Sequence, residues 1–113
     1  MPKPPRFLNL EQVLAIHEDG IACYGGSPGV RDMGLLQSAV HMPQAGFGGE
    51  YFHKDLFEMT AAYLYHLVKN HPFVDGNKRA GLTTALFFME RNGISTRIST
   101  DRISDMVLEV AEG

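Results

Sequence analysis

A nine-residue polar stretch, HPFVDGNKR at residues 71–79, separates two strongly apolar segments, Leu56–Val68 and Ala80–Met89. It combines a titratable histidine, a carboxylate, a glycine and two cations. The flanking segments are expected to form buried helices, and polar groups held between buried helices are unfavourable unless something charged binds them. The pattern therefore predicts a loop between two core helices that binds an anion and places a base and a metal ligand beside it.

The composition is that of one globular domain, residues 1–113. The chain is 44% hydrophobic and 20% charged, and its 113 residues are enough for a real core but too few for two domains. The net charge of −3 argues against direct binding of nucleic acid or a membrane surface. Cys23 is the only cysteine, and no apolar run approaches the roughly 18 residues of a membrane helix. We therefore expect a cytoplasmic protein without an internal disulfide.

Apolar residues recur at helical spacing along most of the chain, so the predicted class is all-α. Asn9, with Gln12 as its capping-box partner, is expected to begin the first helix, and Asp32 a shorter second one. Asp55 is expected to cap a third helix that runs to about Asn70. Two apolar stripes along that helix indicate a central position in the fold.

A second central helix is expected over Gly81–Arg91, with Asn92-Gly93 at its end. Thr100 can cap a last helix near the end of the chain. The second central helix is expected to bury most of its apolar side chains, which are Leu82, Ala85, Leu86, Phe88 and Met89. The predicted fold is thus a compact helical bundle.

Residues 44–53 do not fit a helix, because glycines alternate there with aromatic residues. Glycine loosens the backbone, whereas aromatic rings favour burial. A short β-hairpin-like flap fits this composition, and so does a plain surface loop with the rings tucked beneath it.

Within the polar stretch, Gly76 is expected to precede a helix that begins at Asn77. The first N–H groups of a helix lack intrahelical partners and carry partial positive charge, so they attract phosphate. Lys78 and Arg79 add two cations to the first turn, where the helix dipole disfavours them unless an anion binds. These residues are predicted to bind an anion, and the alternative is a merely solvated pair of cations.

His71 follows the end of the preceding helix and is a candidate base for a hydroxyl proton. Its alternative role is to cap that helix by bonding to backbone carbonyls. Asp75 suits a Mg²⁺ that keeps most of its waters and bridges phosphate oxygens, or it simply pairs with Arg79. Phe73 is expected to anchor the loop in the core.

The stretch resembles the signature of the Fic/Doc superfamily, H-x-F-x-[DE]-G-N-[GK]-R, at every defined position, and the likeness is strongest to the Doc (death-on-curing) branch. The resemblance implies a Fic-type helical bundle in which His71 is the general base, Asp75 holds Mg²⁺ and Arg79 grips the phosphates of ATP. Gly76 and Asn77 would help to form the anion pocket. The flap would align a target segment as an added β-strand. Its docking residues would be Gly46, Phe47, Gly48, Gly49 and Tyr51.

Lys78 distinguishes two activities within this resemblance. AMP-transferring relatives usually carry glycine there, whereas lysine goes with transfer of the ATP γ-phosphate. The resemblance therefore implies a Doc-like protein kinase that phosphorylates a threonine of elongation factor Tu and halts translation. AMP transfer to a protein hydroxyl is the alternative, and a non-catalytic binding module that keeps the fold is the third hypothesis.

Three features depart from the family pattern. The best-known Doc toxin has alanine in place of Gly76, and many AMP-transferring relatives have an arginine in place of Leu82. The chain also stops at Gly113, where Doc-like proteins usually continue into one more helix, so a missing C-terminal helix is one expectation.

The self-inhibitory pattern [ST]-x-x-x-E-[GN] of some Fic proteins does not occur in this sequence. Restraint of an active enzyme would then come from a partner. The resemblance implies a toxin–antitoxin pair in which the C-terminal segment of a small antitoxin protein folds over the active site.

Overall fold

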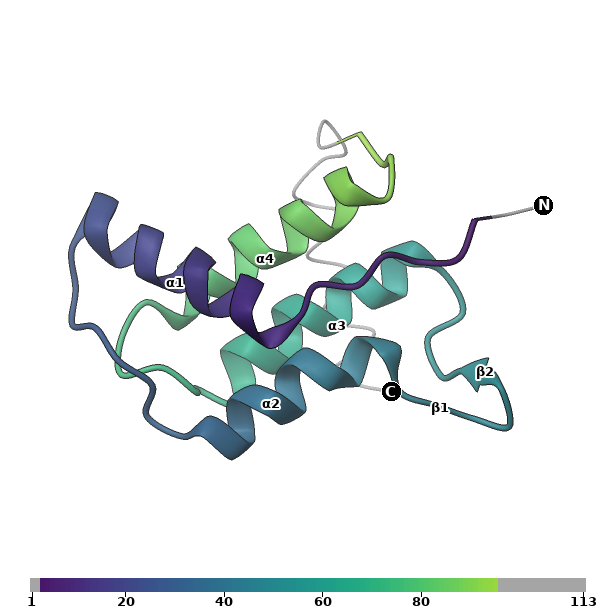
Figure 1. Ribbon diagram of the computed structural model, residues 1–113, viewed down its shortest axis with the longest axis horizontal. Coiled ribbons are helices and arrows are strands. Elements are labelled where there is room, and N and C mark those ends of the chain that lie inside the picture. The colour runs from purple at the N-terminus through teal and green to yellow at the C-terminus, as the bar shows by residue number, and fades with distance from the viewer. Residues whose placement is uncertain (1–2, 96–113) are drawn as a thin grey trace.

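A computed structural model describes residues 3–95 of the chain (Figure 1). The described part contains four α-helices, one 3₁₀ helix and one two-stranded antiparallel sheet. Their bounds are α1 Leu10–Tyr24, α2 Met33–His41, the 3₁₀ helix η1 Met42–Gln44, β1 Gly46–Phe47, β2 Glu50–Tyr51, α3 Leu56–Lys69 and α4 Asn77–Arg91. The predicted all-α class with a hairpin-like flap is confirmed. The helix expected after Thr100 lies outside the described residues.

Helix α3 lies at the centre of the fold (Figure 1). Helices α2 and α4 pack on α3, and α1 packs on α4 and α2. A Cβ atom on Gly81 would lie 3.2 Å from the side chains of both Leu64 and Val68, so the close approach of α3 and α4 depends on that glycine. No helix among residues 3–95 is long and apolar enough to cross a membrane.

The three predicted helix caps are present. The side chain of Asn9 accepts a hydrogen bond from the Gln12 N–H at 2.9 Å, and the Gln12 side chain accepts one from the Asn9 N–H at 2.8 Å. The carboxylates of Asp32 and Asp55 each accept a hydrogen bond from the N–H three residues on. A cap of this kind stabilises a helix by about 1 kcal/mol, so these residues define where α1, α2 and α3 begin.

Tyr63 of α3 ties the N-terminal segment to the core. Its ring is fully buried and lies 5.1 Å from that of Phe88 on α4. The Leu8 N–H donates to the Tyr63 hydroxyl at 2.9 Å, and the hydroxyl donates to the Leu8 carbonyl at 3.3 Å. Burial raises the pKa of Tyr63 to about 12, against a partial lowering by the hydrogen bond with Leu8. The folded state therefore favours the protonated phenol.

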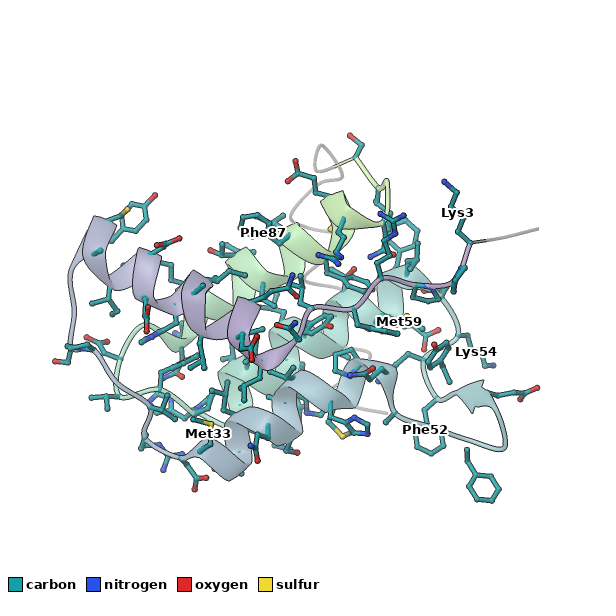
Figure 2. All side chains as sticks on the ribbon, in the orientation of Figure 1. Lys3, Met33, Phe52, Lys54, Met59 and Phe87 are labelled. Carbon is teal, nitrogen blue, oxygen red and sulfur yellow. The ribbon has the colours of Figure 1, made fainter. Side chains whose placement is uncertain are left out.

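The expected burial of Leu82 is wrong, because its side chain is 41% exposed. The buried positions of α4 recur in pairs, with Gly81 in the first pair and Ala85 and Met89 in the later ones. Leu82 lies one residue beyond this stripe and is therefore exposed. Phe87 is also exposed, and Figure 2 labels it on α4. The stripe, rather than the overall apolarity of the segment, decides which side chains enter the core.

Residues 46–51 form a hairpin, so the alternative of a plain loop with buried rings is wrong. Gly46 pairs with Tyr51, and Phe47 pairs with Glu50. The two turn residues between the strands are glycines with φ of 62° and 83°, a region that glycine adopts without strain. The ring of Phe47 is 84% exposed, and Figure 2 shows Phe52 beside the hairpin with its ring also exposed.

Candidate active site

The polar stretch forms a pocket of about 320 Å³ at the N-terminus of α4. Its lining residues are Val68, His71, Val74, Asp75, Gly76, Asn77, Lys78 and Arg79. The base, the carboxylate and both cations of the sequence motif thus meet in one cavity. Pro72 and Phe73 are the two residues of the motif that do not line it.

The hairpin does not line this pocket. It precedes the first residue of α3, whereas the polar loop follows the last residue of α3. A helix of 14 residues is about 21 Å long, and Figure 1 shows the hairpin and the loop between α3 and α4 at opposite ends of the fold. The structure therefore separates the predicted docking residues of the flap from the predicted catalytic residues.

Gly76 opens the N-terminus of α4 to the pocket. Its φ of 75° lies in the left-handed region, and no side chain caps the helix there. The first turn contains Lys78 and Arg79 and no acidic residue. The partial positive charge of the helix end and two formal charges therefore point to the same binding preference, which is for an anion.

The side chain of Asn77 closes the loop on itself. Asn77 is buried, its Oδ1 accepts from the Phe73 N–H at 2.9 Å, and its Nδ2 donates to the Phe73 carbonyl at 3.0 Å. The side-chain amide thereby pairs with both backbone groups of Phe73, as a residue of a neighbouring β-strand would. What Asn77 can offer an anion in the pocket is its backbone N–H.

Phe73 is fully buried, and two elements hold it there. The imidazole of His17 on α1 stacks on its ring with the centroids 3.8 Å apart. His17 Nε2 also lies 2.8 Å from the Asp75 carbonyl, so one side chain contacts the loop on both sides of its turn. Val30, in the connection between α1 and α2, pairs with Phe73 in an isolated β-bridge. Helical spacing alone puts His17 on the same face of α1 as Val13 and Ile21, and no motif in the sequence marks it as part of the site.

The Asp75 carboxylate accepts two backbone hydrogen bonds. Hydrogen bonds from the backbone N–H of Ser27 at 3.0 Å and of Gly76 at 2.8 Å hold the pKa of the Asp75 carboxyl below its usual value. Each oxygen keeps a lone pair for a further partner. No ion pair joins Asp75 to Arg79 within residues 3–95, so the alternative of a simple Asp75–Arg79 pair is not what the structure contains. A Cβ on Gly26 would lie 2.8 Å from the carboxylate, which explains a glycine at that position.

One carboxylate fits a particular kind of metal. No group of three histidine, cysteine or acidic side chains that could hold a metal exists in the described part of the chain. A cation at Asp75 would therefore take most of its ligands from water and phosphate. That is the usual environment of Mg²⁺, which dehydrates reluctantly and often uses only one or two carboxylates.

His71 has an unusual backbone and a ring without a hydrogen-bond partner in residues 3–95. It is the one non-glycine residue there with positive φ, at 50°. The carbonyls at the end of α3 are bound by Arg31, whose Nε donates to the His71 carbonyl at 2.6 Å. The alternative in which the His71 ring caps those carbonyls is thus not observed. The ring is exposed and lines the pocket, where it can accept a proton.

Arg79 contacts a residue that the motif does not contain. Its guanidinium carbon lies 4.8 Å from the centre of the Tyr24 ring, and its Nη1 is 3.5 Å from the Gly25 carbonyl. Lys78 is exposed and forms no ion pair within the described residues. Tyr24 and Arg31 both belong to the region around the connection between α1 and α2, and no pattern in the sequence marks either as part of the site.

Together these features define a helical domain in which the loop between two core helices brings a histidine, a carboxylate and two cations to an uncapped helix N-terminus. A sequence model of the Fic/DOC family matches residues 7–89, more than half of the chain, and the protein belongs to that family.

Two relatives carry names from the Doc branch. Protein kinase doc of Escherichia phage P1 is 35% identical over 108 residues, which cover 96% of this chain and 84% of the relative. Toxin Doc of Mycolicibacterium smegmatis (strain ATCC 700084 / mc(2)155) is 39% identical over 107 residues, covering 93% of this chain and 80% of the relative. The chain is therefore similar to Doc proteins over nearly all of its length.

Proposed function

We propose that the protein is a Doc-type toxin that transfers the γ-phosphate of ATP to a threonine of elongation factor Tu and so inhibits translation. The observation that carries the proposal is the pocket in which His71, Asp75, Lys78 and Arg79 surround an uncapped helix N-terminus. The names of the two relatives, a protein kinase and a toxin, support the same class of activity.

The reaction needs one proton acceptor and a site for phosphate charge. His71 would take the proton of the threonine hydroxyl as its oxygen bonds to the γ-phosphorus. The bond between that phosphorus and the oxygen it shares with the β-phosphate breaks, and ADP leaves with the electron pair. Lys78, Arg79 and the first N–H groups of α4 would stabilise the charge that develops on the phosphate oxygens.

Asp75 is the residue that would hold Mg²⁺. Its ionised carboxylate and its exposure fit a metal bound chiefly by water and phosphate, and among residues 3–95 no other acidic side chain lines the pocket. The metal would supply neutralisation of phosphate charge when bound. The N–H groups of Ser27 and Gly76 would orient the carboxylate for it.

Lys78 favours phosphate transfer over AMP transfer. Its side chain lines the pocket in the first turn of α4, where a glycine would leave more room for the inner phosphates of a nucleotide. A cation at this position also matches the charge of a transferred γ-phosphate. Lys78→Gly is therefore the substitution most suited to move the protein toward AMP transfer.

The deciding experiment measures the intact mass of elongation factor Tu after incubation with the protein, ATP and Mg²⁺. A gain of roughly 80 Da means phosphate, and a gain of about 329 Da means AMP. His71→Ala is the matched control and should give no gain with either outcome. An unmodified factor, tested beside an active Doc protein, would contradict the proposal. Growth inhibition that persists undiminished in His71→Ala would instead favour the non-catalytic binding module.

We also infer a protein antitoxin as the partner. The pocket is open in the described part of the chain, and the sequence contains no self-inhibitory motif to cover it. An antitoxin whose C-terminal segment folds on binding would cover His71 and exclude the substrate. Co-expression with the antitoxin gene should restore growth, and pull-down of the complex from such cells should recover both chains.

A further inference from the structure

We propose that Arg31 is a positioning residue for His71, which it controls through the backbone rather than by touching a substrate. This inference rests on the proposed function for its catalytic consequence, because it assigns His71 the role of base. The observation that carries it is a pair of hydrogen bonds from the Arg31 guanidinium to the backbone carbonyls that precede and follow the α-carbon of His71.

The contact uses two donors of one planar group. Arg31 Nε donates to the His71 carbonyl at 2.6 Å, and Nη2 donates to the Asn70 carbonyl at 2.9 Å. Asn70 is the C-cap of α3, so its carbonyl lies at the helix end where the dipole concentrates partial negative charge, and the His71 carbonyl is the next along the chain. A guanidinium matches two adjacent acceptors in a fixed geometry, which a lysine ammonium cannot do. The contact is therefore both charge-assisted and directional.

The backbone of His71 needs such a contact. Its φ of 50° is in the left-handed region, which residues with a side chain avoid. Conformations of this kind persist only where the surroundings enforce them, and they concentrate at functional sites. With this positive φ, the His71 carbonyl accepts a hydrogen bond from Arg31 while the His71 ring lines the pocket. Removing the guanidinium would remove the two hydrogen bonds that stabilise His71 in this conformation.

The backbone of Arg31 is fixed against the same loop. Its N–H donates to the Pro72 carbonyl at 2.7 Å, and the N–H of Asp32 donates to the same oxygen at 3.0 Å. Arg31 thus donates hydrogen bonds to three successive carbonyls, those of Asn70, His71 and Pro72. The second tether at this helix end, from the Asn70 side chain to the Leu35 carbonyl at 3.0 Å, does not contact His71. Arg31 is consequently the side chain that specifies the conformation of the candidate base.

The test compares Arg31→Ala and Arg31→Lys with a matched control, Asn92→Ala. Asn92 donates from its side chain to the Phe88 carbonyl at the C-terminal end of α4 and to the Arg6 carbonyl of the N-terminal segment, so its loss also removes a side-chain contact with a helix-end carbonyl. Three quantities are measured on folded protein with ATP, Mg²⁺ and elongation factor Tu: kcat, KM for ATP, and the three-bond coupling between the amide and α protons of His71. That coupling reports φ directly.

Arg31→Ala should lower kcat about a hundredfold, as expected when a reacting group is displaced by about an ångström. KM for ATP should change by less than about threefold, because the phosphate-binding residues are untouched. The His71 coupling should move away from its wild-type value. Arg31→Lys should recover only part of kcat, and Asn92→Ala should lower stability while keeping kcat and the coupling.

Two results would overturn the inference. One is an Arg31→Ala protein with wild-type coupling and kcat, and the other is an equal loss of kcat in Asn92→Ala. If the wild-type protein transferred no group to its target, the proposed function would fail separately. The coupling would then decide alone, because a changed value in Arg31→Ala supports control of His71 and an unchanged value refutes it.

Discussion

The imidazole of His17 lies flat against the ring of Phe73, with the two planes only 3° apart. Both side chains are buried, and His17 Nε2 reaches the Asp75 carbonyl at 2.8 Å. A single residue of α1 therefore fixes the loop through an aromatic contact and a polar one. The position of the pocket relative to α1 depends on this pair.

His17→Leu should destabilise the protein by about 2–3 kcal/mol. It keeps an apolar side chain but leaves the Asp75 carbonyl without its partner and loses the ring stack. Urea unfolding measures the change, and His41→Leu on the exposed surface of α2 is the control, with an expected change within about 0.5 kcal/mol. Equal effects of the two substitutions would show that the His17–Phe73 pair does not hold the loop.

The raised pKa of Tyr63 should make the free energy of unfolding depend on pH in the alkaline range. Its pKa is raised to about 12 in the folded protein from an ordinary value of 10.0, so folding favours the protonated phenol. The stabilisation is complete below pH 10 and is lost as the pH rises from about 10 to about 12, by roughly 3 kcal/mol at most. Unfolding free energies measured across this range should fall more steeply for the wild type than for Tyr63→Phe. Parallel curves would contradict the assignment to Tyr63.

Asp75→Asn should weaken Mg²⁺-dependent ATP binding by about tenfold or more, because a carboxamide oxygen carries no net charge for the metal. Titration calorimetry with ATP, with and without Mg²⁺, measures the effect. Binding of ATP in the absence of Mg²⁺ should not weaken, since the substitution removes a negative charge from the pocket. Glu11→Gln, in the first turn of α1, is the control for loss of a carboxylate. Identical Mg²⁺ dependence in wild type and Asp75→Asn would place the metal elsewhere.

The Tyr24 ring should strengthen ATP binding through its contact with the Arg79 guanidinium. A cation–π contact at an exposed site contributes about 0.5–1 kcal/mol, so Tyr24→Leu should raise KM for ATP about two- to fivefold. Tyr24→Phe keeps the ring under the guanidinium and should behave like the wild type. Steady-state kinetics with varied ATP measures both variants. A rise in KM for Tyr24→Phe would mean that the hydroxyl, and not the ring, matters.

The parts of the site that the sequence predicted are those with a local signature. In the fold, the capping box of Asn9 and Gln12 lies within four residues, and in the site the polar run with Gly76 predicts a helix that begins at Asn77. Arg31 and Tyr24 have no such signature, because they act on backbone carbonyls or on a cation more than 35 residues away. A carbonyl is present in every residue, so no residue type in the sequence reveals which one will be bound.

The same limit applies to Leu82 and to the flap. The apolar residues of α4 fixed its existence but not which of them face α1 and α3, since two neighbours rather than one determine the buried stripe. Glycine and aromatic residues predicted the hairpin, yet only the arrangement of the helices places it at the far end of α3 from His71. A docking role for the flap therefore stays a prediction that needs its own test.

Gly46→Ala provides that test. A Cβ at Gly46 would collide with the Glu50 carbonyl oxygen across the hairpin, so the strands must separate. The hairpin is exposed, and its loss should change the global unfolding free energy by less than about 1 kcal/mol. If the hairpin aligns the target as an added strand, KM for the protein target should rise about tenfold while ATP binding stays unchanged. An unchanged KM for the target would mean that the substrate reaches His71 without the flap, in agreement with the distance that α3 places between them.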